Sequence, residues 1–208
     1  MSDFETEEQQ LEELKKWWRD NHKIVIVGTL LGFAAVFGYR GWQGYQESQR
    51  QAASQIYSEL GNALKENRTQ SVLQIGGTLV SKYPRSNYAA LAALAMARVY
   101  VDGNDLGAAH AKLQWVVDNC DQPDIEITAR LRLARVLVAE GKPNLAVPLL
   151  TEIKTDAFRA VLQETLGDVY HAMHQPQQAR QAYTAALQAL QPEDNRTLLQ
   201  MKLDNLGS

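Results

Sequence analysis

Cysteine is nearly absent from this chain of 208 residues, with Cys120 as its one representative. A single thiol can form neither a disulfide within the chain nor a cluster of thiolate metal ligands. Acidic residues stand close to it at Asp118 and Asp121, and such neighbours make a thiol a poor nucleophile. Disulfide scaffolds, thiolate metal centres and cysteine-based catalysis are therefore excluded.

Catalytic and phosphate-binding motifs are missing as well. The sequence contains no glycine-rich phosphate loop, no Gly-x-Ser-x-Gly turn and no His-Glu-x-x-His pair. Charge beyond residue 40 is balanced, with 16 basic and 17 acidic residues, so no basic field is available to hold a polyanion. We therefore expect neither an enzyme nor a nucleic-acid-binding protein, and no cofactor.

One group of residues has a spacing that could suit a metal ion. His171 and His174 lie three residues apart, and Glu164 and Asp168 precede them by a turn or two of helix. The stronger interpretation places His174 at a helix end, where a partly cationic ring meets unpaired carbonyl groups, and leaves the carboxylates in solvent. We therefore predict no metal site.

Long apolar runs are rare too, and the most informative segment is such a run. Ile24–Tyr39 contains sixteen residues without a charge or a side-chain amide, bounded by Lys23 and Arg40. As a helix it covers roughly 24 Å, and its flanks extend it toward the ~30 Å of a bilayer core. A buried helix of a soluble domain would show a polar face, which this run lacks. Aromatic residues suited to the membrane interfaces stand on both sides, at Trp17, Trp18, Trp42 and Tyr45.

The flanks of this run also predict its orientation. The segment before it is long and begins with acidic residues, and no Ala-x-Ala cleavage site follows Tyr39, which favours an uncleaved signal anchor. Four basic residues precede the run (Lys15, Lys16, Arg19 and Lys23), and only Arg40 and Arg50 follow it closely. Because basic flanks stay in the cytoplasm, we expect a type II protein of the bacterial inner membrane. Its parts would be a cytoplasmic tail (1–22), a transmembrane anchor (23–42) and a periplasmic domain (43–208).

Small residues repeat along one face of the predicted span. Gly28, Gly32 and Ala35 share that face, and such spacing lets a second transmembrane helix approach closely. The same spacing also arises by chance in apolar segments. These three residues are therefore candidates for helix packing in the membrane.

Beyond the span, strand signals are almost absent and apolar residues recur three and four apart, which predicts an all-α domain. Residues 41–66 read as a helix continuing from the span, with an interruption at 67–69. Short links then separate the remaining helices in pairs, as in antiparallel helix hairpins. The expected helices are 70–82, 87–101, 105–119, 125–140, 143–154, 157–173, 176–190 and 194–205. Gly76 and Gly77 weaken the first of these unless another backbone packs closely there.

The pairs repeat a pattern that resembles the tetratricopeptide repeat. Small residues stand where two helices would cross, and large ones where they would fill the space between hairpins. The last copy carries the pattern at Leu166, Gly167, Tyr170, Ala179, Tyr183 and Ala186. Earlier copies place Ala134, Leu137, Ala146 and Leu150 at 33 residues before it, and Ala97, Tyr100, Ala109, Leu113 and Val116 at 37 before those. The closing proline appears one position late, at Pro192, and residues 41–83 hold a weaker fourth pair.

Stacked hairpins form a groove lined by the first helix of each pair. The repeat pattern turns two sets of four residues toward it: Leu91, Leu94, Arg98 and Val101, then Thr128, Leu131, Arg135 and Val138. Glu164, Asp168 and His171 would extend it. We expect this apolar floor with two arginines to hold an extended or helical segment of a partner. Alternatively, these residues pack against the C-terminal helix 194–205 folding back into the groove.

In combination, these features resemble the YfgM family, the ancillary subunits of the bacterial Sec translocon. The resemblance rests on the anchor, on Tyr83-Pro84-Arg85-Ser86 before the first good repeat, on the degenerate repeats and on the ending 201–206. It implies an inner-membrane protein that associates with Sec translocon subunits and with a membrane-anchored periplasmic chaperone of the prolyl-isomerase type. It also implies a role in passing translocated client chains to periplasmic chaperones.

Two functions from different classes remain open on the sequence. The first is a non-catalytic docking subunit at the translocon, in a single-pass membrane protein with a tetratricopeptide-repeat-like helical solenoid. The second is an anchored regulator whose acidic cytoplasmic tail, residues 1–14, binds a stress-response protein. Deletion of residues 2–14 separates the two, because only the second requires the tail.

Overall fold

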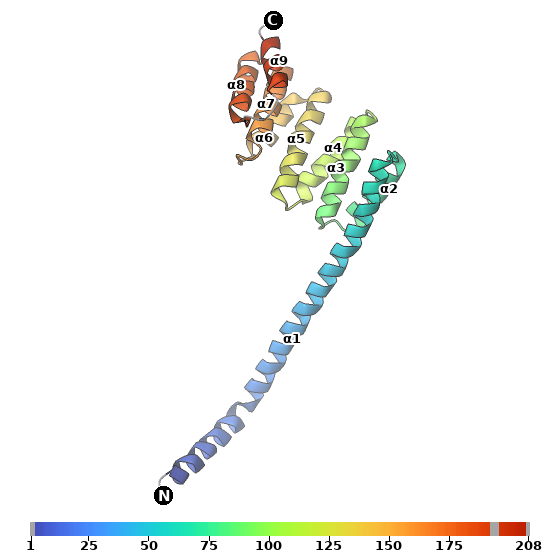
Figure 1. Ribbon diagram of the computed structural model, residues 1–208. Helices are drawn as coiled ribbons and strands as arrows, with labels where there is room; N and C mark the ends of the chain where they lie inside the picture. The colour runs from blue at the N-terminus through green and yellow to red at the C-terminus, as the bar shows by residue number, and fades with distance from the viewer. Residues whose placement is uncertain (1–2, 192–195, 207–208) are drawn as a thin grey trace. The chain divides into compact units, whose positions relative to one another are not determined.

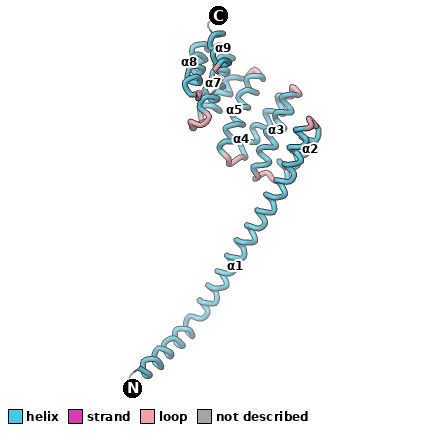
Figure 2. The backbone as a smooth tube through the Cα atoms, in the orientation of Figure 1, coloured by secondary structure: helices cyan, strands magenta, loops and turns pink. Residues whose placement is uncertain are grey.

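The computed structural model describes residues 3–191 and 196–206, with side chains from residue 9 onward. All regular structure in these residues is helical, which confirms the predicted all-α class (Figure 1, Figure 2). The chain divides into two compact units, Met1–Gln51 and Ala52–Ser208. The first helix, α1, begins in the first unit and ends in the second.

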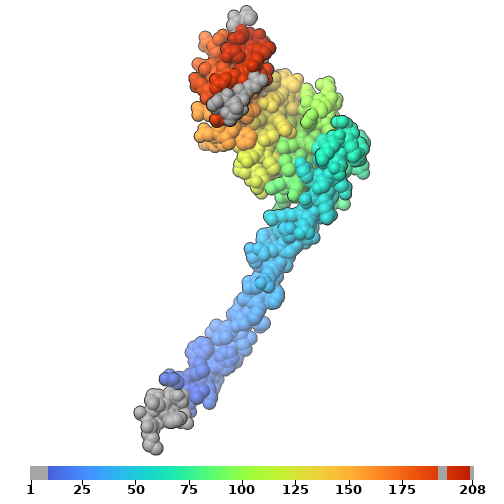
Figure 3. All heavy atoms as spheres, in the orientation of Figure 1, coloured from blue at the N-terminus to red at the C-terminus, as the bar shows by residue number. Residues whose placement is uncertain are grey.

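The first unit consists of a single exposed helix. α1 runs without a break from Asp3 to Lys65, as a continuation of the span into residues 41–66 predicts. Its apolar side chains are exposed all round, including Ile24 at 72%, Leu31 at 66% and Phe37 at 66%, and Figure 3 shows this stretch as a bare column of side chains. Among the described residues α1 is the one helix long and apolar enough to cross a membrane, which makes it the candidate span.

The second unit is a row of helix hairpins. The end of α1 pairs with α2 (Thr69–Lys82), α3 (Asn87–Asp102) with α4 (Leu106–Asn119), α5 (Pro123–Ala139) with α6 (Ala146–Thr151), and α7 (Arg159–Ala172) with α8 (Pro176–Ala189), before α9 (Thr197–Asn205) ends the row. Each hairpin also contacts the next one, since α2 packs on α3, α4 on α5, α6 on α7 and α8 on α9. This is the predicted hairpin solenoid.

Every hairpin contains the same turn, and the turns fix the register of the repeats. A residue in the left-handed region ends the first helix of each pair: Asn67 (φ 53°), Asn104 (φ 58°), Gly141 (φ 75°) and His174 (φ 58°). The following N–H reaches back five residues to a carbonyl, as from Gln175 to Tyr170 at 2.9 Å, which is a Schellman cap. His174 is thus at a helix end, as predicted, but backbone N–H groups bond the last carbonyls. The first hairpin, expected to be the weaker fourth copy, follows the same register.

Small and large residues are matched where the two helices of a hairpin cross. A methyl group on Gly167 would lie 2.3 Å from a ring carbon of Tyr183, so only glycine fits there. In the first hairpin the sizes are reversed: a methyl group on Gly76 would lie 3.5 Å from the Leu60 side chain and 2.7 Å from the sulfur of Met96. The central hairpins hold the buried pairs Ala97 with Leu113 and Ala134 with Leu150 at the equivalent positions.

Gly76 and Gly77 therefore differ in their surroundings. From the sequence, this glycine pair was expected to weaken the helix unless another backbone packs closely there. The neighbours of Gly76 are instead the side chains of Met96 and Leu60, and a methyl group on Gly77 would meet nothing within 4 Å. Gly76 is needed for packing, whereas Gly77 leaves an open position in a helix interior.

The structure corrects the helix predicted over 143–154. A 3₁₀ turn, Pro143–Leu145, is followed by α6, which spans six residues only, Ala146–Thr151. Pro148 explains the late start of the α-helix, because it has no N–H to donate to the carbonyl of residue 144 and allows an α-helix to begin only just before it. The closing Pro192 lies outside the described residues, and the helix expected from residue 194 begins in the described part at Thr197.

Candidate partner-binding groove

The eight residues predicted to line a groove lie on α3 and α5, the first helices of the two central hairpins. Leu94 and Leu131 are buried, with 6% and 5% of their surface exposed. Arg98, Val101 and Arg135 are exposed. The remaining three, Leu91, Thr128 and Val138, are half-buried.

Two hollows lie along this face of the solenoid. The smaller, of about 270 Å³, lies among α3, α4 and α5 and is lined by Ala97, Arg98, Val101, Leu106, Leu113, Arg132, Arg135, Val136 and Ala139. The larger, of about 420 Å³, lies between the end of α1, α2, α3 and α5 and is lined by Leu64, Asn67, Thr69, Val72, Leu91, Leu94, Ala95, Arg98, Val99, Asp102 and Arg132. Both share Arg98 and Arg132, so they adjoin. We call the two hollows together the arginine groove.

The groove contains five of the eight predicted residues. Leu91 and Leu94 line the larger hollow, Val101 and Arg135 line the smaller one, and Arg98 lines both. The other three, Thr128, Leu131 and Val138, line neither hollow. Of the four residues predicted on α5, Arg135 alone lines one of these hollows.

Arg132 is the residue that the sequence pattern missed. It lines both hollows, three residues before Arg135 and therefore on nearly the same face of α5. The equivalent positions of the neighbouring repeats hold uncharged residues, Ala95 on α3 and Thr165 on α7. The i, i+3 spacing to Arg135 was the signal that could have identified it.

The arginines of the groove are poorly matched by carboxylates. Arg98 faces Asp102 at 3.7 Å, and both side chains are largely exposed, so the attraction is weak. Among the described residues Arg132 makes no hydrogen bond or ion pair. Burial lowers the pKa of Arg132, and the positive charges of Arg135 and Arg98 lower it further. The groove is therefore a site of positive potential in a domain of nearly balanced charge.

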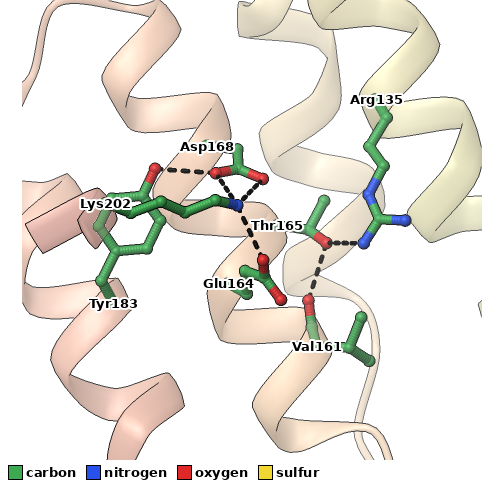
Figure 4. Close-up of polar contacts among 7 residues, drawn as sticks. All are labelled: Arg135, Val161, Glu164, Thr165, Asp168, Tyr183 and Lys202. Atoms are coloured by element: carbon green, nitrogen blue, oxygen red, sulfur yellow. Dashed lines mark hydrogen bonds and ion pairs between the residues drawn. The ribbon is translucent and has the colours of Figure 1, made fainter. Parts of the chain in front are cut away.

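Arg135 is oriented by the neighbouring hairpin. Its Nη2 donates a hydrogen bond to Thr165 Oγ1 at 3.3 Å, and Thr165 in turn donates to the carbonyl of Val161 at 2.7 Å (Figure 4). Thr165 is fully buried, so these two partners keep its hydroxyl from being left unsatisfied in the core. The contact to a neutral hydroxyl positions the guanidinium without cancelling its charge.

Glu164 and Asp168 on α7 form ion pairs with a lysine of the same chain. Lys202 on α9 lies 2.8 Å from Glu164 and 2.7 Å from Asp168, and the hydroxyl of Tyr183 donates to Asp168 at 2.8 Å (Figure 4). These carboxylates are therefore not free in solvent. The part of the chain that the structure describes holds no group of three potential metal ligands, and His171 is exposed.

This network alters the ionisation of two groups. Burial raises the pKa of Tyr183 well above its usual range, and the hydrogen bond to the Asp168 carboxylate raises it further. For Lys202, burial alone would lower the pKa, but hydrogen bonds to Asp168 and Glu164 and their charges raise it overall. Lys202 therefore stays charged and holds α9 against α7. The residues of α9 line neither hollow of the arginine groove.

The candidate packing face of the span is bare in this chain. A methyl group on Gly28 or Gly32 would meet nothing within 4 Å, and Ala35 is exposed. This face therefore remains available to lipid or to another membrane helix. Of the acidic tail, residues 1–2 and the side chains of residues 1–8 lie outside the described part, so its predicted binding role stays a prediction.

Comparisons with known proteins agree with this architecture. Residues 15–208 match the family model described as a tetratricopeptide repeat-like domain. A tetratricopeptide repeat protein of known structure from Parabacteroides merdae covers 80% of this chain and 80% of its own at 12% identity, but its TM-score of 0.33 is too low to compare the arrangement of repeats.

Curated relatives align over nearly the whole chain. A protein of Escherichia coli (strain K12) named Ancillary SecYEG translocon subunit is 30% identical over 210 residues, with 100% of both chains covered. A protein of the same name from Neisseria gonorrhoeae is 33% identical over 204 residues, covering 96% of this chain and 97% of its own. One from Haemophilus influenzae is 29% identical over 200 residues, covering 96% and 97%.

Proposed function

This chain belongs to the family of ancillary SecYEG translocon subunits, and on that premise we propose that it is a non-catalytic subunit of the Sec translocon in the bacterial inner membrane. The observation that carries the proposal is the alignment with relatives of that name over both the apolar helix and the repeats, at up to 33% identity. The repeat fold supports a docking role, because stacked hairpins offer an open surface to other chains.

The same proposal assigns each part of the chain to a side of the membrane. Residues 1–22 lie in the cytoplasm, residues 23–42 span the bilayer, and residues 43–208 form the periplasmic repeat domain. Support comes from the basic residues before the span (Lys15, Lys16, Arg19 and Lys23) and from the exposed apolar surface of α1.

Protease added to cells whose outer membrane has been opened tests this topology. We expect it to degrade the repeat domain and to leave a short membrane-protected fragment that contains the tail. Immunoblotting with tags at either end identifies the fragment, and a cytoplasmic protein serves as the control for an intact inner membrane. A repeat domain that survives while a periplasmic marker is digested would show the reverse orientation.

In the periplasm, we propose that the repeat domain docks a membrane-anchored chaperone of the prolyl-isomerase type and helps to pass translocated client chains to periplasmic chaperones. The arginine groove supports this role, since it is open and lies on the first helices of the hairpins, where α9 does not cover it. Docking through the groove and association through the span are separate contacts, and each can be removed alone.

The association with SecYEG is tested by isolating the tagged full-length chain from membranes in mild detergent and measuring the SecYEG recovered with it. The wild-type chain is expected to recover SecYEG, and failure to do so would refute the proposed function. The double substitution Gly28→Leu and Gly32→Leu is expected to lower recovery several-fold, because leucine prevents close approach of a second helix.

Gly38→Leu is the matched control for this experiment. Gly38 lies in the same apolar segment, about a quarter-turn away from the face of Gly28 and Gly32, and it too has no neighbour within 4 Å. Recovery should therefore stay at the wild-type level. If the double substitution also leaves recovery unchanged, the periplasmic domain is the main contact and this face of the span is not used.

A further inference from the structure

Charges in the repeat domain are matched by the chain itself at several places, and the arginine groove is an exception. Arg130, two residues before Arg132, lies 2.8 Å from Glu126 and 2.6 Å from Glu152. Lys202 has two carboxylates within 2.8 Å. By contrast, Arg98 has one carboxylate at 3.7 Å, and Arg132 has none among the described residues. The groove thus offers positive charge that the described residues neutralise only in part, through the exposed pair of Arg98 with Asp102.

In the smaller hollow the arginines border an apolar floor. In the smaller hollow the residues other than the three arginines are all apolar, from α3, α4 and α5. At about 270 Å³ it has room for a large side chain. An occupant therefore gains from burying an apolar group and from placing carboxylates beside it, since charge-assisted hydrogen bonds to guanidinium are the stronger kind.

We propose that the arginine groove binds an acidic peptide segment of a partner protein, with a large apolar side chain in the smaller hollow and carboxylates on Arg98, Arg132 and Arg135. This rests on the proposed function to the extent that the repeat domain docks other proteins. Charge complementarity selects the occupant: the cluster has three guanidinium groups and one weakly placed carboxylate, Asp102. The three arginines lie on α3 and α5. The first helix of the next hairpin, α7, carries Glu164 and Asp168, which Lys202 neutralises. The positive surface therefore does not continue onto α7, and the bound segment is short.

The neutral contact of Arg135 with Thr165 suits this role. Because Thr165 Oγ1 occupies one donor of the guanidinium at 3.3 Å, the side chain is held in place and the remaining donors are available. Less side-chain entropy is then lost when a carboxylate binds. Arg132 contributes in a different way, since repulsion from Arg98 and Arg135 is relieved when an anion enters between them.

The test measures binding of fluorescently labelled synthetic peptides to the full-length chain in nanodiscs by anisotropy. One peptide carries leucine and glutamate at helical spacing, a second has every glutamate replaced by glutamine, and a third has every leucine replaced by alanine. We expect the first to bind, and the second and third to bind at least about tenfold more weakly. Raised salt should weaken the first peptide more than the second, because salt screens charge.

Variants of the chain locate the site. Arg132→Gln is expected to weaken binding of the acidic peptide about tenfold while leaving the glutamine peptide unchanged. Arg180→Gln, at an exposed arginine on α8 outside the groove, is the matched control and should bind as the wild type does. Circular dichroism of each variant checks that the helices are intact. Equal binding of the acidic and glutamine peptides, or equal binding by Arg132→Gln and wild type, would overturn the proposal.

A competing occupant is tested in the same assay. If vesicles of anionic phospholipid displace the peptide, and Arg132→Gln abolishes vesicle binding as well, the groove binds a membrane surface and the peptide proposal is wrong. In cells, Arg98→Glu with Arg135→Glu should lose the prolyl-isomerase-type chaperone and retain SecYEG. If the acidic and glutamine peptides bind equally while SecYEG is still recovered, this inference alone is refuted. If the wild-type preparation contains no SecYEG, the proposed function is refuted.

Discussion

Gly167→Ala is expected to destabilise the repeat domain by about 1–3 kcal/mol, which is the usual cost of overpacking a core. The added methyl group would lie 2.3 Å and 2.4 Å from two ring carbons of Tyr183, and no atom can be accommodated at that distance. Tyr183 cannot simply turn away, because it is buried and its hydroxyl is hydrogen-bonded to Asp168 at 2.8 Å. The α7–α8 hairpin therefore has to separate.

Gly77→Ala is the matched control, with an effect of opposite sign. Gly77 lies inside α2, and a methyl group there meets nothing within 4 Å. Alanine in a helix interior is favoured over glycine by about 0.5–1 kcal/mol, so this variant should be slightly more stable than the wild type. Thermal unfolding of the full-length chain, followed by circular dichroism in one detergent, compares the two. A Gly167→Ala chain as stable as wild type would contradict the packing described for this crossing.

A second substitution should rescue the first. Gly167→Ala combined with Tyr183→Leu gives the last hairpin the Ala–Leu pair that the central hairpins already have at Ala97–Leu113 and Ala134–Leu150. We expect the double variant to be more stable than the sum of the two single effects predicts, because the substituted residues touch. The double variant should regain only part of the lost stability, because Tyr183→Leu also removes the hydrogen bond to Asp168.

Lys202→Met is expected to release α9 from α7 and to lower stability by about 1–2 kcal/mol, because two carboxylates lose a charge-assisted partner. Glu164 and Asp168 have only 22% and 32% of their side chains exposed, so water replaces the lost contacts incompletely. Hydrogen–deuterium exchange over residues 197–205 should quicken at least about tenfold. Lys154→Met, at an exposed lysine, is the control, and unchanged exchange in α9 would show that Leu199 and its apolar neighbours hold the helix without the ion pair.

The same network gives a pH dependence of defined sign. The pKa of Lys202 is raised in the folded chain above its ordinary value of 10.5. The stability that Lys202 contributes is therefore fully present below that ordinary value and is lost as the pH rises through the folded pKa. Tyr183, whose pKa is also raised, acts in the same direction. Because the ordinary pKa values of Tyr183 and Lys202 are 10.0 and 10.5, α9 of the wild type should loosen only above about pH 10, and in Lys202→Met this alkaline transition should shrink.

The helices and turns could be predicted because the forces that form them are local. Apolar residues three and four apart marked the helices, and Ser86 caps the start of α3 by accepting a hydrogen bond from the N–H of Ala89 at 3.2 Å. Asn104, Gly141 and His174 recur at one repeat position because each tolerates the left-handed conformation of the turn. The first hairpin was harder to align, because Leu60 and Gly76 reverse the small and large positions of the pattern.

The details of the groove depend on side chains far apart in the sequence, and this limited their prediction. The repeat register predicted one common face for Arg98 and Arg135, and both residues line the hollows, since equivalent positions face the same way. It could not show that α9 neutralises Glu164 and Asp168, because that contact joins residues 34 and more apart. Arg132 was missed because the equivalent positions of the neighbouring repeats hold Ala95 and Thr165, so only its i, i+3 spacing to Arg135 pointed to the groove.

The shortness of α6 has a consequence for how the row of hairpins comes apart. In a linear array of repeats each hairpin contacts only its neighbours, so two hairpins separate most readily where one of them has a short helix. The six residues of α6, restricted by Pro148, make that place the joint between α5 and α7. The hydrogen bond from Arg135 to Thr165 crosses the same joint. That hydrogen bond therefore links two hairpins at the joint that contains the shortest α-helix of the row in the described residues.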